Sequence, residues 1–334
     1  MTQEIIYLVI HGINMKVYLF LISIACTLTA CQPSSQSSYP SSPITYYVPW
    51  AAGGMTDLTS RMMATSLQQT LGEPVNVVNR VGGGGVVGHL ALAKAKPDGY
   101  NIGAVTVEIT MLPHMGLTDL THQDYHFLAL QINNAAAVTV QQEAKWQNVQ
   151  ELLDDIEANP GELKASGTAR GGVWDLARLG MLQEAGLPID ALPWVPSQGS
   201  APALQELLAG GVDVVTASLS EVDAMRKSGL VRVLGVMSEE RLERFPEVPT
   251  LKEQGIDWSI GGWVALGVPA STPADIVAKL DSAVQVAAHT PAYIDALTQA
   301  GSTIQFKTGS ELDRFVAEQD KVNKQLMQSA GIAK

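Results

Sequence analysis

The sequence predicts an α/β protein with two lobes, and three observations support this fold class. Short β-rich runs alternate with helical stretches from Ile44 onward, a pattern typical of layered α/β folds. The alternation forms two sets, one that begins at Ile44 and one that begins near Val149. The chain has 334 residues, which exceeds one typical domain and therefore favours two lobes.

The first set begins with a strand over 44–50 and a helix over 56–72. Thr56 or Asp57 is expected at the cap of that helix, and Gly72 is its stop signal. The remaining elements expected in this set are a strand over 75–79, a helix over 86–96, and strands over 100–107 and 127–132.

The second set alternates in the same way and is followed by a helical tail. The helices expected in the set cover 149–159, 173–186, 201–210 and 221–229. The strands expected in it cover 163–167, 191–196, 212–218 and 231–237. One more strand is expected over 264–269, and then helices over 273–289, 291–301 and 310–331. We expect the C-terminal helices to return to the first lobe.

Composition and charge exclude one class of partner. Apolar residues make up 46% of the chain and charged residues 16%, which is typical of a globular protein with real cores. The net charge of −12 argues against nucleic acid as a partner, because no basic stripe is available to meet phosphates.

The N-terminal segment predicts export and lipidation. The apolar run 17–30 has about 14 residues, a length typical of a signal-peptide core and short for a membrane span. It closes on Leu28-Thr29-Ala30-Cys31, which resembles a bacterial lipobox, in which the cysteine carries lipid. We expect residues 1–31 to be a lipoprotein signal peptide that ends at Cys31. An ordinary secretory signal is the alternative, and the start codon is either Met1 or Met15.

Residues 32–43 are rich in Ser and Pro and lack an apolar period, so they predict a disordered tether. Cys26 lies in the signal peptide and Cys31 is the lipid site, so no disulfide is expected. The sequence therefore predicts a periplasmic or cell-envelope protein, lipid-anchored to either the inner or the outer membrane.

Glycine-rich turns occur three times between a strand and a helix, at 51–54, 82–85 and 167–172. Such turns let backbone N–H groups approach a ligand at a helix N-terminus, where the helix dipole favours negative charge. Three of them in two lobes predict an anion-binding cleft. One turn also contains Gly83-x-Gly85-x-x-Gly88, but a dinucleotide site needs its first glycine directly after the first strand of the βαβ unit, and this turn comes later.

The evidence for an enzyme is weak. No phosphate-loop lysine follows a glycine turn, no G-x-S-x-G elbow is present, and the histidines are scattered, so neither a cofactor nor a metal is expected. Four carboxylates are either polar site groups or helix caps and surface residues: Asp57, Glu108, Asp175 and Glu221.

Several segments together resemble the TctC/Bug receptors, the extracytoplasmic solute-binding proteins of tripartite tricarboxylate transporters. The signature segments are "YVPWAAGGMTDLTSR" (47–61), "VVNRVGGGGVVG" (77–88) and "AKAKPDGYNI" (93–102). The similarity continues through "SGTARGGVWDLA" (166–177), 194–221, 244–255 and 261–273. It covers essentially the whole chain from Ile44 to the C-terminus.

The resemblance implies a two-lobed periplasmic-binding-protein (Venus-flytrap) fold, type II-like, whose lobes close over a small carboxylate. It implies that 44–140 plus 262–334 form lobe 1 and that 141–261 form lobe 2. The ligand-binding residues that it implies in lobe 1 are Trp50, Ala51, Gly53, Gly54, Thr56, Asp57 and Thr106. Those in lobe 2 are Ser166, Gly167, Thr168, Gly171, Gly172, Ser197 and Ser218. Asp57 is expected to fix its loop rather than to touch an anion.

Other residues near these turns have two interpretations each. Arg80 either braces the first-lobe turns with Asn79 or supplies a cation to the ligand. Relatives often carry His where Asp175 stands, so a multiply charged ligand such as citrate is less expected here, and Arg170 either replaces that charge or faces solvent. Three indoles either line a cleft wall or pack in the core: Trp174, Trp194 and Trp263.

The resemblance implies a monomeric receptor without catalytic activity. It would capture a small organic acid and deliver it to a membrane permease of one large and one small subunit. Two alternatives remain open from the sequence: a ligand sensor that feeds a two-component system, and an exported hydrolase that acts in the cleft. The identity of the acid is not encoded in a cradle built mainly from main-chain donors.

Overall fold

A computed structural model describes residues 39–334. The predicted signal peptide, the lipobox Cys31 and most of the predicted tether lie outside the described residues. Within the described residues, no helix combines the length and the apolar character that a membrane span requires.

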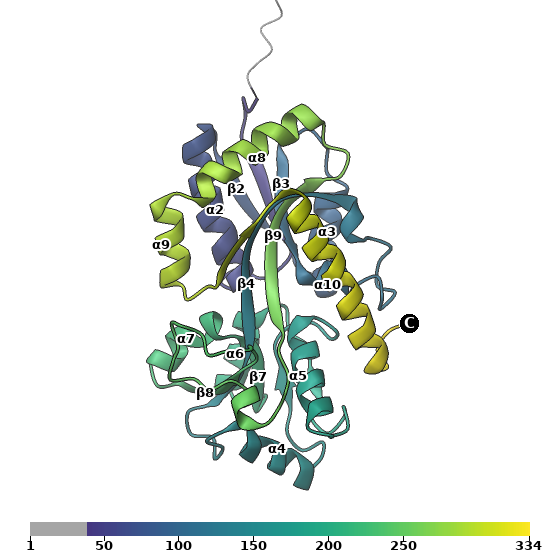
Figure 1. Cartoon of the computed structure of the whole chain (residues 1–334), viewed down its shortest axis with the longest axis vertical. Helices are drawn as coiled ribbons and strands as arrows, with labels where there is room; N and C mark the ends of the chain where they lie inside the picture. The colour runs from purple at the N-terminus through teal and green to yellow at the C-terminus, as the bar shows by residue number, and fades with distance from the viewer. Residues whose placement is uncertain (1–38) are drawn as a thin grey trace, which may run out of the picture. The chain divides into compact units, whose positions relative to one another are not determined.

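The strands form one mixed sheet that runs through two lobes (Figure 1). Lobe 1 contains β1 (Ile44–Val48), β2 (Val75–Asn79), β3 (Asn101–Thr106), β9 (Gly261–Pro269) and β10 (Ile304–Lys307). Lobe 2 contains β5 (Ala165–Ser166), β6 (Trp194–Val195), β7 (Val214–Ser218) and β8 (Val231–Val236). β1 pairs in parallel with β2 and β3, and β5 pairs in parallel with β6 and β7, so the carboxyl ends of these strands meet at one edge in each lobe.

β4 (Tyr125–Gln141) belongs to both lobes. It pairs with β9 over residues 125–135 and then with β7 and β8 over residues 136–141, antiparallel in every case. The chain returns to lobe 1 beside it, where the Ala136 N–H donates to the Ile260 carbonyl at 2.9 Å just before β9 begins. β4 and β9 thus form the connection about which the two lobes are joined.

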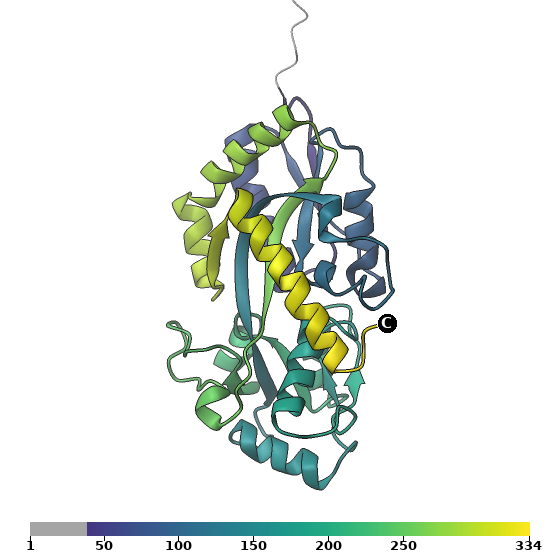
Figure 2. The same cartoon turned by 45° about the vertical axis from the view of Figure 1, so that its right-hand side comes forward.

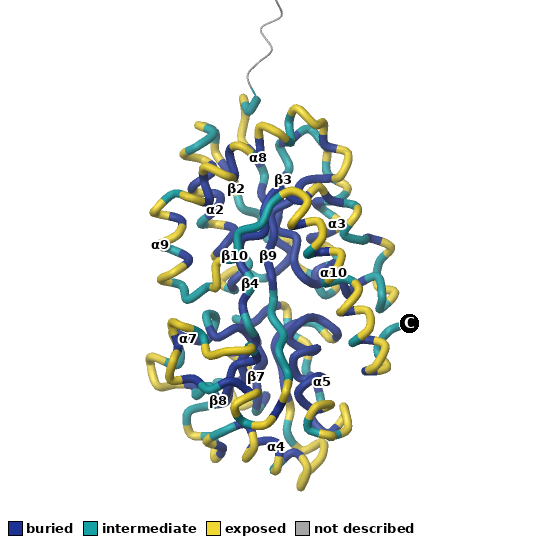
Figure 3. The backbone as a smooth tube through the Cα atoms, viewed as in Figure 1, coloured by how far each residue is buried: buried dark blue, intermediate teal, exposed yellow. Residues whose placement is uncertain are grey.

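Helices cover both faces of the sheet. Those on the strands of lobe 1 are α2 (Met55–Leu71), α3 (Val86–Ala93), α8 (Ala274–Ala288), α9 (Pro291–Gln299) and α10 (Gly309–Ser329). Those of lobe 2 are α4 (Val149–Ala158), α5 (Val173–Glu184), α6 (Ser200–Leu208) and α7 (Leu219–Lys227). Buried residues follow the strands, and exposed residues lie on the outward faces of the helices (Figure 3). All five residues of β7 are buried, as expected for a strand covered on both faces.

α10 contacts both lobes. It crosses β4 in lobe 1, and its C-terminal end reaches α5 of lobe 2 (Figure 2). The Asn323 side chain of α10 donates to the Thr110 hydroxyl at 2.8 Å, which ties the helix to the segment that follows β3. The C-terminal helices therefore return to lobe 1, as the sequence predicts.

The structure differs from the sequence prediction in several places. The N-cap of α2 is Gly54, not Thr56 or Asp57, which both lie within the first turn of the helix. β4 continues beyond the strand predicted over 127–132, because Asn133 and Asn134, which resemble turn residues, stay within the ladder. β10 was not predicted, since it has only four residues, in which apolar and polar side chains alternate, and it is held in the sheet by its pairing with β4. β5 and β6 are two residues long, shorter than the predicted strands. The residue bounds of the lobes stay predictions.

Candidate ligand-binding cleft

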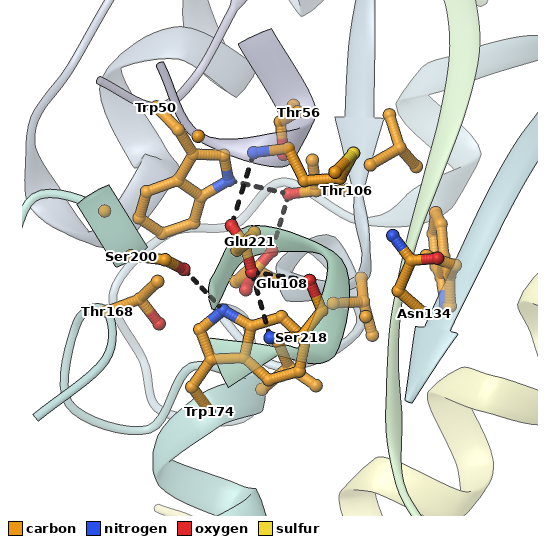
Figure 4. Close-up of a pocket in the computed structure, with 18 of the residues that line it drawn as sticks. Trp50, Thr56, Thr106, Glu108, Asn134, Thr168, Trp174, Ser200, Ser218 and Glu221 are labelled. Carbon is orange, nitrogen blue, oxygen red and sulfur yellow. Dashed lines mark hydrogen bonds between the residues drawn. The ribbon is translucent and has the colours of Figure 1, made fainter. Parts of the chain in front are cut away.

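A cleft opens where the carboxyl ends of the strands of both lobes meet the N-termini of the following helices (Figure 4). Its cavity volume is about 50 Å³. A water molecule needs roughly 10–15 Å³ of such space, so the cavity has room for a few waters. The lining residues are Trp50, Ala51, Gly54, Met55, Thr56, Thr106, Val107, Glu108, Ile132, Asn134, Thr168, Val173, Trp174, Gly199, Ser200, Ser218, Glu221, Gly262, Trp263 and Val264.

The loop before α2 is held by the buried carboxylate of Asp57. The Gly53 N–H donates to Asp57 Oδ2 at 3.0 Å, and Gly53 adopts a positive φ of 88° that suits glycine. Arg61 and Asn79 also donate to the carboxylate, at 2.9 Å each, and Asn79 bonds the Trp50 carbonyl as well. Burial alone would raise the pKa of Asp57, but these donors hold it below its ordinary value. Asp57 therefore fixes the loop as predicted.

The loop before α5 repeats this arrangement in lobe 2. The Gly171 N–H donates to Asp175 Oδ2 at 2.8 Å, and Gly171 also has a positive φ of 71°. Arg178 forms an ion pair with Asp175 Oδ1 at 2.6 Å, and both side chains are buried. Asp175 thus serves as a loop brace and does not reach the lining of the cleft.

Two indoles form opposite walls of the cleft, one from each lobe. The Trp50 Nε1–H donates to the Thr106 hydroxyl at 3.3 Å, and the Trp174 Nε1–H donates to the Ser200 hydroxyl at 3.0 Å. With its polar edge bound in this way, each ring is fixed in orientation. The remaining ring surface borders the cavity (Figure 4).

Two glutamates cross the cleft in opposite directions. Glu221 of α7, in lobe 2, accepts from the Met55 N–H at the start of α2 at 3.2 Å. Glu108, which follows β3 in lobe 1, accepts from the Val173 N–H at the start of α5 and from the Thr106 hydroxyl at 2.5 Å. Each helix N-terminus therefore receives a carboxylate from the opposite lobe, which is favourable with the helix dipole.

The glycines that precede the two helices lie next to the carboxylates. Gly54 and Gly172 are the N-caps of α2 and α5, both are extended, and neither has a side chain that caps the helix. A Cβ on Gly54 would lie 3.7 Å from Glu221 Oε1, and a Cβ on Gly172 would lie 3.7 Å from Glu108 Oε1. The carboxylates take the place that a capping side chain usually fills.

Burial perturbs two titratable groups beside the lobe 1 wall. Burial raises the pKa of Glu108, and the negative charge of Glu221 adds to the rise. Burial lowers the pKa of His89 to about 4. His89 Nε2 accepts the Thr106 N–H at 3.1 Å while Nδ1 donates to the Gly85 carbonyl at 2.9 Å, so the ring is neutral. His89 thereby positions Thr106, the hydroxyl that bonds both Trp50 and Glu108.

Half of the residues predicted for the site line the cleft. They are Trp50, Ala51, Gly54, Thr56, Thr106, Thr168 and Ser218. The others do not line it: Gly53, Asp57, Ser166, Gly167, Gly171, Gly172 and Ser197. Two of these side chains bond the backbone: Ser166 donates to the Val195 carbonyl at 2.7 Å, and Ser197 donates to the Gly199 carbonyl at 3.0 Å. That any of these residues contacts a ligand stays a prediction.

The remaining candidates divide in the same way. Glu108, Glu221, Trp174 and Trp263 line the cleft. Arg80, Arg170 and Trp194 do not, and Arg170 instead donates to the Trp194 carbonyl at 3.2 Å. Sequence reasoning missed Asn134 and Ser200. Ser200 follows a glycine at the start of a predicted helix and was detectable as a further turn donor, whereas Asn134 lies inside an unpredicted part of β4.

The four consecutive glycines 82–85 do not line the cleft. A Cβ on Gly85 would lie 3.3 Å from the Trp50 ring, so this turn packs behind the lobe 1 wall. A Cβ on Gly88 would lie 2.4 Å from the Pro49 Cα atom, which explains the glycine as a point of close helix–strand contact. Among residues 39–334, no group of three or more His, Cys, Asp or Glu side chains is arranged to hold a metal ion.

The fold and the interlobe cleft define the class of two-lobed periplasmic solute-binding proteins. Residues 59–332 match the family described as "Tripartite tricarboxylate transporter family receptor", and the chain belongs to this family. It is 30% identical to the protein BugT of Bordetella pertussis over 92% of this chain and 95% of that protein.

Two solved structures support the same assignment. The periplasmic binding protein BugD has a TM-score of 0.83 at 27% identity, over 89% of this chain and all of that chain. MatC (Rpa3494) from Rhodopseudomonas palustris, solved with bound malate, has a TM-score of 0.79 at 25% identity, over 86% of this chain and 99% of that chain. The predicted family and fold are thus confirmed, and the relatives are solute-binding receptors rather than enzymes.

Proposed function

We propose that this protein is an extracytoplasmic receptor that captures a small organic carboxylate between its lobes. It then delivers the acid to a tripartite tricarboxylate-type permease of one large and one small membrane subunit. Binding requires no chemistry, since affinity comes from backbone N–H groups, hydroxyls and lobe closure. The malate found in MatC belongs to the same chemical class of ligand.

One observation carries the proposal: the N-termini of α2 and α5 open on the same cleft, and an N–H group at each donates to a carboxylate oxygen. Those oxygens belong to Glu221 and Glu108, so the geometry for binding a carboxylate is already present twice. A ligand carboxylate that reaches either helix start meets the positive end of the helix dipole. The hydroxyls of Thr56, Thr168 and Ser200 add donors around it.

A thermal-shift screen of mono-, di- and tricarboxylates tests the proposal. We expect at least one small acid to raise the melting temperature of the purified protein, because a ligand that binds only the folded state stabilises it. Isothermal titration calorimetry then gives its affinity. If only another class of solute, such as sugars, stabilises the protein, the proposed ligand class is wrong.

The anchoring to the membrane has its own test. We propose that lipid on Cys31 holds the receptor at the membrane, since residues 28–31 resemble a lipobox. The Cys31→Ser variant should then leave the membrane fraction and appear in the soluble fraction of the cell envelope. A variant that stays in the membrane fraction contradicts lipidation at this cysteine.

A further inference from the structure

A second cavity borders the same two strands as the cleft, on their other face. Its volume is about 720 Å³, which lies within the roughly 300–1,000 Å³ typical of small-molecule sites. Side chains along a strand point alternately to its two faces. Ile132 and Asn134 of β4 line the cleft, whereas Asn133 and Ala135 line the second cavity. The two cavities share no lining residue and are therefore separate sites.

The lining of the second cavity carries no charge. Among the described residues that line it, none is Asp, Glu, Lys, Arg or His, although charged residues make up 16% of the chain. The cleft differs in this respect, since Glu108 and Glu221 line it. A charged group in the second cavity would lose hydration and find no opposite charge on the lining to replace it. The lining therefore favours an uncharged occupant.

α10 presents an uncharged face to the second cavity. Gln319, Val322, Leu326 and Ser329 are spaced three, four and three residues apart, so they lie on one face of the helix. Val322 is 45% exposed. The charged residues in this part of the helix do not line the cavity: Glu318, Asp320, Lys321 and Lys324. A helix usually turns charged side chains to solvent, so this face is suited to covering the apolar part of a small molecule.

Trp258 and Asn133 add an indole and an amide to the lining. The ring of Trp258 is packed on α5, where a Cβ on Gly180 would lie 2.1 Å from its Cε2 atom, so its position is fixed. Asn133 Oδ1 is buried and has no hydrogen-bond donor within residues 39–334. The terminal torsion of asparagine is broad, so the amide can turn toward a molecule in the cavity. A donor there would relieve the cost of the unpaired oxygen.

We propose that the second cavity is a binding site for a small uncharged molecule in which an apolar ring or chain carries an amide group. Trp258 and the face of α10 around Val322 provide the apolar surface. Asn133 and the neutral amides and hydroxyls of the lining provide hydrogen bonds. The inference goes beyond the proposed capture of a carboxylate and does not depend on it, because the two cavities have different linings.

Three probes of one shape and different charge test the proposal: benzamide, which is neutral, benzoate and benzamidine. The readout is the indole N–H signals of the six tryptophans in the ¹⁵N-labelled purified protein, with the Trp258 signal assigned by its loss in Trp258→Phe. We expect benzamide to shift the Trp258 signal saturably and at least tenfold lower concentration than either charged probe, because the lining offers no counter-charge. Absence of this shift, or an equal shift with a charged probe, overturns the proposal. Shifts confined to Trp50 and Trp174 would place benzamide in the cleft and also overturn it.

A matched pair of variants on α10 locates the site. Val322→Glu puts a charge on the lining and should weaken the benzamide-dependent shift of Trp258 by about tenfold. Gln328→Glu adds the same charge to the same helix at an exposed position outside the lining and should leave the shift unchanged. Both positions are exposed, so neither change disturbs the core. Equal benzamide binding by the two variants overturns the assignment of the site to this face of α10.

Discussion

The loops before α2 and α5 use the same construction in two different environments. In each, a glycine with positive φ donates its N–H to an aspartate four residues later, and an arginine of the same helix pairs with that aspartate. In lobe 1 the arginine is Arg61, whose side chain is 49% exposed. In lobe 2 it is Arg178, whose side chain is 4% exposed.

The difference in exposure changes what the arginine does. Arg61 reaches Asn79 at 3.1 Å and otherwise meets solvent. Arg178 also donates to the carbonyls of Ile189 and Leu192, at 2.7 and 2.8 Å, and its guanidinium lies 5.6 Å from the centre of the Trp194 ring. The lobe 2 loop is therefore tied to two neighbouring segments of its lobe, while the lobe 1 loop is tied mainly to itself and to β2.

The largest expected effect comes from removing the buried arginine. Arg178→Met leaves Asp175 as a buried carboxylate without its cation and should destabilise the protein by about 3–5 kcal/mol. The matched change Arg61→Met removes an exposed partner and should cost about 1 kcal/mol or less. Urea unfolding followed by circular dichroism measures both free energies. Equal costs for the two variants would contradict the distinction drawn between the lobes.

The next largest effect is a loss of stability at low pH that involves the Trp50 wall of the cleft and not the Trp174 wall. The Trp50 wall depends on His89, which must stay neutral to accept the Thr106 N–H. The Trp174 wall is held by hydroxyls, since Ser200 bonds its Nε1–H and Thr216 bonds its carbonyl. Because burial lowers the pKa of His89 to about 4, the unfolded chain binds this proton more tightly than the native protein does.

The contribution of His89 to stability is therefore complete above about pH 6.5 and is lost as the pH falls toward 4. The loss amounts to about 3 kcal/mol, from 2.5 pKa units at about 1.36 kcal/mol each. His89→Gln keeps a donor and an acceptor without a proton to gain, so its unfolding free energy should fall less over this range. His289→Gln, on the exposed end of α8, is the control. Parallel curves for wild type and His89→Gln would rule out this role.

Local sequence signals predicted the parts of the site that are local. The glycine turns at 51–54 and 167–172 lie at the helix starts where they were expected, and Asp57 holds its loop within four residues. These features depend on backbone conformation and short-range hydrogen bonds, which neighbouring residues specify. The alternation of strand-like and helical segments likewise predicted the α/β fold class.

The pairing across the cleft was not predictable in this way. Glu221 was a candidate from the sequence, but its partner Met55 lies 166 positions away, and no local pattern connects them. The same holds for β4. Asn133 and Asn134 stay in the strand because they pair with β9, although asparagine has a low intrinsic propensity for strands. Burial of Glu108 also depends on the approach of α5 from the other lobe.

The smallest expected effect compares the two glutamates of the cleft, of which Glu108 is buried and Glu221 half-buried. Because burial raises the pKa of Glu108, the native protein holds this proton more tightly than the unfolded chain. Its contribution to stability is present below the ordinary glutamate pKa and is lost as the pH rises toward the raised value. Glu108→Gln should remove this loss, so the variant should gain stability over wild type as the pH increases from about 4.5 to neutrality.

Urea unfolding at pH 4.5, 6 and 7.5 measures this difference, with Glu157→Gln on the exposed face of α4 as the control for net charge. Gln keeps an oxygen that accepts from Val173 or Thr106, so the α5 terminus retains a partner. Glu221→Gln, which removes the charge that adds to the pKa of Glu108, should weaken the same pH dependence without abolishing it. If wild type and Glu108→Gln have the same unfolding free energy at every pH, burial does not oppose the charge of Glu108. Both carboxylates are then held equally well by the helices they face.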